Sequence, residues 1–87
     1  MTKEQLFKVF EECERTRQGI RVEFLMPNGD IETIINTNKS LEIKKKFYDR
    51  FYDDNLVNIK NNKIKIIEAS PIQIRRTPKV ITIFEEV

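Results

Sequence analysis

The feature that most constrains the fold is an alternating apolar pattern on both sides of a strong turn sequence. Apolar residues occupy alternate positions from 20 to 26, Ile31, Thr33 and Ile35 resume the alternation, and Pro-Asn-Gly-Asp stands between the two runs at 27–30. Asn-Gly is a dipeptide typical of tight turns between antiparallel strands. Successive side chains of a strand point to opposite faces, so each of these strands has one apolar face. The sequence therefore predicts a β-hairpin, and this hairpin needs a second layer to cover its apolar face.

The first candidate for that layer is a helix from Lys3 to about Arg17. Thr2 and Gln5 match a capping box, in which each side chain bonds the backbone N–H of the other residue. Apolar residues at positions 6, 10 and 13 form a stripe at helical spacing. We expect Gly19 to supply the left-handed residue that ends the helix.

A second amphipathic helix is predicted between residues 41 and 55. Asn38 and Ser40 are both candidates for its N-cap, and the sequence does not choose between them. Lys44 falls near the middle of the apolar side, where its stem is expected to pack while its ammonium group reaches past the helix end. The residues projected onto one broad apolar face are Leu41, Phe47, Tyr48, Phe51 and Tyr52.

Three further extended segments follow the second helix. Residues 56–60 and 63–67 flank Asn61-Asn62, which predicts a second tight hairpin because asparagine tolerates positive φ. Residues 72–74 are a short strand or an extended connection between two prolines. The segment from Val80 to Phe84 is rich in β-branched residues and is predicted to be a terminal strand.

Together these elements predict an α+β fold with the order α-β-β-α-β-β-β. The expected architecture has two layers, an antiparallel sheet of four to five strands with two helices on one face. No linker or change in composition divides the sequence, so residues 1–87 are expected to form one domain.

The composition argues against an enzyme and against a cofactor. There is no histidine, which removes the commonest general base and transition-metal ligand, and Cys13 is the only cysteine. The two glycines do not form a phosphate-binding loop, and no metal site is predicted. No apolar run reaches the length of a membrane span, and the first residues do not resemble a signal peptide, so the expected compartment is the cytoplasm.

Binding remains the expected class of function, and the residues allow two kinds of partner. The favoured one is a protein, contacted by aromatic anchors on the second helix and by the exposed edge of the terminal strand, which could also pair two copies in a homodimer. The residues assigned to this surface are Tyr48, Tyr52, Val80, Thr82 and Phe84. The alternative is a nucleic acid, contacted by the basic C-terminal third through Lys63, Lys65, Arg75, Arg76 and Lys79.

Residues 35–68 combine an aromatic-rich helix with a lysine- and asparagine-rich turn. The helical part reads Lys-Lys-Phe-Tyr-Asp-Arg-Phe-Tyr-Asp-Asp-Asn-Leu at 45–56, and Lys-Asn-Asn-Lys-Ile-Lys-Ile follows at 60–66. This pattern resembles small uncharacterised proteins encoded by phages and prophages of low-GC Gram-positive bacteria. The resemblance implies an accessory protein that binds or inhibits a host or phage protein in the host cytoplasm.

Overall fold

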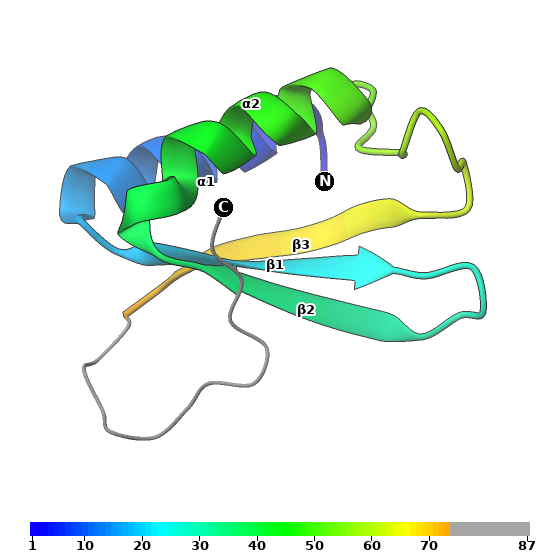
Figure 1. Ribbon diagram of the computed structural model, residues 1–87, viewed down its shortest axis with the longest axis horizontal. Coiled ribbons are helices and arrows are strands. Elements are labelled where there is room, and N and C mark those ends of the chain that lie inside the picture. The colour runs from blue at the N-terminus through cyan, green and yellow to red at the C-terminus, as the bar shows by residue number, and fades with distance from the viewer. Residues whose placement is uncertain (74–87) are drawn as a thin grey trace.

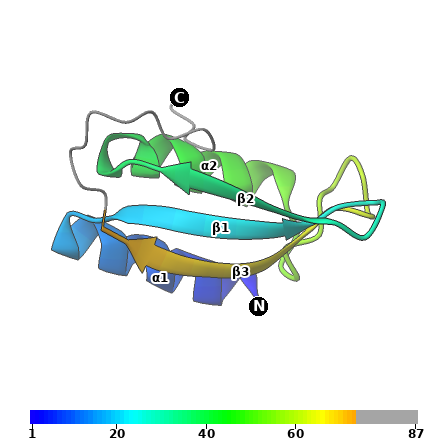
Figure 2. The ribbon, with the colours of Figure 1, turned by 90° about the horizontal axis from the view of Figure 1, so that it is seen from below.

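The computed structural model describes residues 1–73, which form two helices and one antiparallel sheet. The elements in chain order are α1 (Lys3–Thr16), β1 (Gly19–Leu25), β2 (Ile31–Asn36), the short 3₁₀ helix η1 (Asn38–Ser40), α2 (Leu41–Phe51) and β3 (Lys65–Ile72). The strand order is β2-β1-β3, so β1 is central. Both helices lie on the same side of the sheet (Figure 1). Seen from below, the other face carries neither helix (Figure 2).

The strand count is the main correction to the predicted fold. The α+β class and the antiparallel pairing hold, but residues 1–73 contain three strands in place of the expected four to five. The first hairpin is confirmed, with Val22 opposite Ile34 and a turn in which Gly29 has a φ of 89°. The predicted terminal strand from Val80 to Phe84 lies outside the described residues.

The predicted second hairpin is shortened to one antiparallel bridge, because asparagine side chains bind backbone groups that a longer strand ladder would use. The Asn58 Oδ1 atom accepts hydrogen bonds from the backbone N–H groups of Lys60 and Asn61, at 2.9 and 3.0 Å. The Asn61 Oδ1 atom accepts another from Lys63 at 3.1 Å. Such local bonds favour turns over strands. Residues 56–64 consequently contain no full strand, and bridges join Tyr52 to Asn58 and Val57 to Lys65. The second bridge is flanked by two backbone hydrogen bonds of 2.9 Å, from the Asn58 N–H to the Ile64 carbonyl and from the Ile66 N–H to the Leu56 carbonyl.

Strand β3 is longer than predicted and continues through Ser70 and Pro71. Proline lacks the N–H group that a central strand needs, and it is tolerated in strands at a sheet edge. Pro71 lies opposite Ile20 of β1, and no strand within residues 1–73 pairs with the other side of β3. The proline therefore marks this edge of the described sheet and does not end the strand.

The capping box of α1 forms as predicted. The Gln5 N–H donates to Thr2 Oγ1 at 3.2 Å, and the Thr2 N–H donates to Gln5 Oε1 at 2.9 Å. The helix ends two residues earlier than the predicted glycine, because Arg17 adopts the left-handed conformation with a φ of 55°. Gly19 is already the first residue of β1.

Replacing Arg17 by glycine should therefore stabilise the protein by about 0.5–1 kcal/mol, because glycine takes positive φ without strain. The unfolding free energy in urea measures this gain. The matched control is Arg15→Gly in the last turn of α1, where glycine should instead cost about 1 kcal/mol. If Arg17→Gly and Arg15→Gly change the unfolding free energy in the same direction, the assigned end of α1 is wrong.

The hydrophobic core lies between the helices and the sheet. Its buried residues come from both helices, from β1 and β3, and from the loop that follows α2. They are Leu6, Phe10, Cys13, Ile20, Val22, Phe24, Leu41, Tyr48, Tyr52, Leu56, Ile66 and Ala69. Within residues 1–73, no helix is both long enough and apolar enough to cross a membrane.

Candidate functional site

Helix α2 carries two neighbouring stripes of large side chains, and only one of them enters the core. Leu41, Lys44 and Tyr48 are buried, and they recur at the spacing of one helix face. Ile43 and Phe47 lie about 100° around the helix from that face, and they are 50% and 43% exposed. Helix α1 contacts α2, and the α2 residues that line the groove between the two helices are Glu42, Lys45, Lys46 and Asp49, which do not belong to the exposed stripe.

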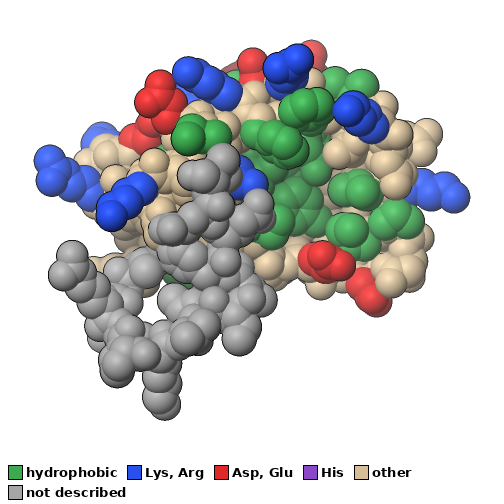
Figure 3. Space-filling model, in the orientation of Figure 1, with side chains coloured by type: hydrophobic (Ala, Val, Ile, Leu, Met, Phe, Trp, Pro, Cys, Tyr) green, Lys and Arg blue, Asp and Glu red, His purple; other side chains and the backbone are tan. Residues whose placement is uncertain are grey.

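The exposed stripe continues through Phe51 into the loop. The rings of Phe47 and Phe51 are 4.7 Å apart between centroids, and Phe51 is half-buried. Its carbonyl accepts a 2.9 Å hydrogen bond from the backbone of Ile59, whose side chain is 63% exposed. We name Ile43, Phe47, Phe51 and Ile59 the outer surface of α2. Figure 3, in which α2 faces the viewer, shows hydrophobic side chains gathered on this side of the molecule.

Basic side chains border the outer surface of α2. The Lys60 ammonium lies 5.3 Å from the centroid of the Phe51 ring, and the Arg50 guanidinium lies 5.6 Å from it. The Lys44 ammonium lies 5.3 Å from the Phe47 ring. Cations at such distances are attracted to the faces of aromatic rings. The surface is thus an aromatic and aliphatic area with positive charge at its margin.

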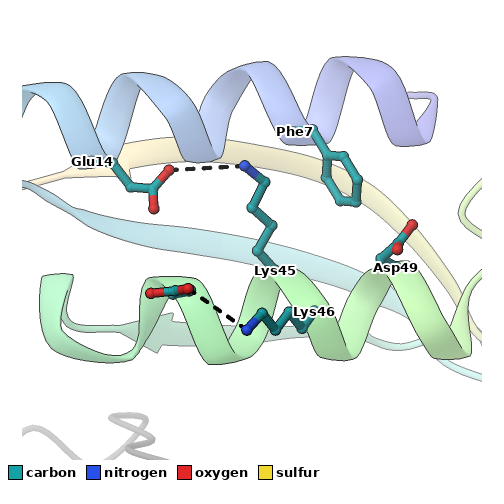
Figure 4. A pocket seen from close by; sticks show the side chains of 6 residues that line it. Phe7, Glu14, Lys45, Lys46 and Asp49 are labelled. Carbon is teal, nitrogen blue, oxygen red and sulfur yellow. Dashed lines mark ion pairs between the residues drawn. The ribbon is translucent and has the colours of Figure 1, made fainter.

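A groove between α1 and α2 is an alternative site that has a defined shape. It measures about 290 Å³ and is lined by Phe7, Glu14, Glu42, Lys45, Lys46 and Asp49. Figure 4 shows that the charged groups bridge the two helices or pair along α2, with Lys45 3.9 Å from Glu14 and Lys46 3.6 Å from Glu42. The Lys45 ammonium also lies 5.7 Å from the Phe7 ring. Because these charges are already paired, we assign the groove to the packing of α1 against α2.

Asp53 has a structural role at the end of α2. The Asp53 carboxylate accepts two backbone N–H groups, from Asn55 at 2.9 Å and Val57 at 3.0 Å, and so organises the exit from α2. No group of three or more potential metal-ligating side chains occurs within residues 1–73.

Cys13 is fully buried in the core. Burial, with a smaller contribution from the Glu12 carboxylate, raises the pKa of its thiol from 9.0 to about 11. A thiol of raised pKa is a poor nucleophile at neutral pH. Cys13 is therefore a packing residue, as its position on the predicted helix indicated.

The raised pKa predicts a specific dependence of stability on pH. The folded protein holds the thiol proton more tightly than the unfolded chain, so this contribution is complete below pH 9 and is lost as the pH rises through about 11. Unfolding free energies of the wild type and Cys13→Ala should therefore converge over this range, because only the wild type loses this contribution. A difference between the two unfolding free energies that stays constant from pH 9 to about 11 would contradict the raised pKa of the Cys13 thiol.

Four of the sequence-predicted binding residues lie within the described part of the chain: Tyr48, Tyr52, Lys63 and Lys65. Tyr48 and Tyr52 are 1% and 4% exposed, so both rings belong to the core and are not the surface anchors that their spacing suggested. Lys63 lies in the loop after α2 and Lys65 begins β3. The other predicted contacts fall outside the described residues: Val80, Thr82, Phe84, Arg75, Arg76 and Lys79.

Sequence reasoning missed the outer surface of α2, although a signal was present. Ile43, Phe47 and Phe51 are spaced four residues apart, which places them in one row along a helix. The row adjoins the buried stripe, so a helical projection merges the two into one broad apolar face.

A scan against family models, a search of curated proteins and a search of solved structures each find no match to the chain.

Proposed function

We propose that the protein is a non-enzymatic protein-interaction module and that it binds its partner through the outer surface of α2. The observation that carries the proposal is the exposure of Ile43, Phe47 and Ile59, three large apolar side chains that are between 43% and 63% accessible. Single exposed apolar side chains are common, whereas a contiguous group bordered by polar residues is typical of an interaction site. Arginine beside aromatic rings is also typical of the residues that dominate binding energy.

The chemistry of the described residues supports binding over catalysis. The chain has no histidine, and its one thiol is buried with a raised pKa. The groove between the helices holds ion pairs and no nucleophile beside a free base. The resemblance of residues 35–68 to small phage and prophage proteins supports the same class of function, because such accessory proteins often act by binding a host or phage protein.

The experiment is a selection of binding peptides followed by two matched substitutions. Displayed random peptides of about 16 residues, enough for roughly four helical turns, are selected on the immobilised full chain. Phe47→Asp places a charge in the outer surface of α2. Ile31→Asp is the control, because Ile31 is 49% exposed on a strand of the opposite layer, away from α2.

We expect Phe47→Asp to weaken binding of the selected peptides by roughly tenfold or more, and Ile31→Asp to leave binding within about twofold. Both variants should keep most of the unfolding free energy, since both side chains are already largely in solvent. Peptides that bind Phe47→Asp as tightly as the wild type would reject the proposal.

A further inference from the structure

The charges around the outer surface of α2 indicate the chemistry of its partner. Within residues 1–73, no carboxylate lies within ion-pair distance of Arg50 or Lys60. Both cations instead rest against the Phe51 ring, at 5.6 and 5.3 Å. Their charges are held at the margin of an apolar surface and are available to a bound molecule.

The acidic side chains of α2 are used elsewhere. Glu42 pairs with Lys46 one turn along the helix, and Asp49 pairs with Lys3 of α1 at 3.5 Å. Asp53, just beyond the helix, accepts two backbone N–H groups. The carboxylates therefore leave the margin near Phe51 positively charged.

A second copy of the chain does not fit this charge pattern. In a two-fold dimer the same surface meets itself, so the interface would gather the Arg50 and Lys60 charges of both copies at its margin. Like charges at the rim of an interface disfavour a pairing. A partner with carboxylates around an apolar centre has the complementary arrangement.

The shape of the surface favours a helical partner. Ile43, Phe47 and Phe51 form one row along α2, and such a row packs into the groove between side-chain rows of a second helix. An extended peptide binds by forming hydrogen bonds with unpaired backbone N–H and C=O groups of a strand. The backbone groups of α2 are already bonded within the helix. Ile43 and Ile59 are aliphatic and offer no ring for a nucleic-acid base to stack on.

On the basis of the proposed function, we infer that the outer surface of α2 binds an acidic amphipathic helix. Large apolar side chains of that helix cover Phe47 and Phe51, and its Asp or Glu residues pair with Arg50 and Lys60. Desolvated contacts between carboxylates and these cations would add specificity to the apolar contact.

The test uses the tightest peptide from the selection described above and a version with every Asp and Glu replaced by Asn and Gln. We expect the parent peptide to carry several acidic residues beside apolar residues at helical spacing, and the amide version to bind the wild type roughly tenfold more weakly. In the double variant Arg50→Glu and Lys60→Glu the preference should disappear. The single control Lys8→Glu reverses an exposed charge on α1 and should not alter it.

The outcomes separate the two proposals. The acidic partner is wrong if the selected peptides are neutral or basic, or if the double variant still prefers the acidic peptide over its amide version. Loss of binding in Phe47→Asp would in that case still support the docking surface. Binding that survives Phe47→Asp would overturn both. A fluorescent single-stranded DNA of about 12 nucleotides provides the last arm, and its binding to the wild type but not to Phe47→Asp would assign the surface to nucleic acid instead.

Discussion

Replacing Tyr48 by alanine is expected to lower the unfolding free energy by about 3–5 kcal/mol, the range measured for large aromatic side chains in protein cores. The Tyr48 side chain is 1% exposed, and its ring lies at the centre of the aromatic core. Its centroid is 6.0 Å from that of Phe10, 6.1 Å from that of Phe24 and 5.7 Å from that of Tyr52. Removing it leaves a cavity bordered by both helices and by β1.

The matched control for Tyr48 is its neighbour Phe47. Phe47→Ala should cost no more than about 1 kcal/mol, because 43% of this side chain is already exposed. Urea titration of both variants measures the difference. Equal losses at the two positions would contradict the assignment of one stripe of α2 to the core and the other to the surface.

The second large effect concerns the central strand. Val22→Pro should destabilise the protein by about 3 kcal/mol or more beyond the loss caused by Val22→Ala, because proline removes a ladder donor and cannot adopt the strand conformation freely. Val22 lies opposite Ile34 of β2 on one side and Ala69 of β3 on the other. In a central strand each backbone N–H faces one neighbour or the other, so the substitution cannot avoid the ladder.

The unfolding free energies of Val22→Pro and Val22→Ala test the strand order β2-β1-β3. Val22→Ala removes the same buried methyl groups and keeps the backbone N–H, which isolates the contribution of the hydrogen bond. A proline variant as stable as the alanine variant would mean that β1 is not central.

Local signals in the sequence correctly predicted the elements whose determinants are close together. The capping box of Thr2 and Gln5 and the Asn-Gly turn each depend on residues within one turn of chain, and both form as expected. The turn at Asn61 also forms, with the Ile64 N–H bonded to the Asn61 carbonyl at 3.0 Å. The flanking strands pair only over residues 56–58 and 64–66, because the same asparagine side chains that favour the turn also bind the neighbouring N–H groups.

The burial of α2 depended on information that periodicity does not contain. Apolar and aromatic residues cover two adjacent stripes of the helix, and only packing against β1 and α1 determines which stripe is buried. The helical projection places both Phe47 and Tyr48 on the apolar face, but only Tyr48 is buried, while Phe47 is 43% exposed. Lys44, which the projection puts near the middle of that face, is 6% exposed and lies in the buried stripe. The sequence assigns Phe47 and Phe51 to the apolar face and does not single out Ile43 or Ile59, so it does not reveal the proposed interaction site.

A titration of the isotope-labelled full chain with the tightest selected peptide, followed through backbone amide chemical shifts, tests the central claim most directly. The claim predicts that the largest shifts fall on residues 43–51 of α2 and on Ile59 and Lys60. Shifts confined to the opposite face of the sheet, around Leu25, Ile31 and Ile67, would place the interaction on the other layer and contradict it.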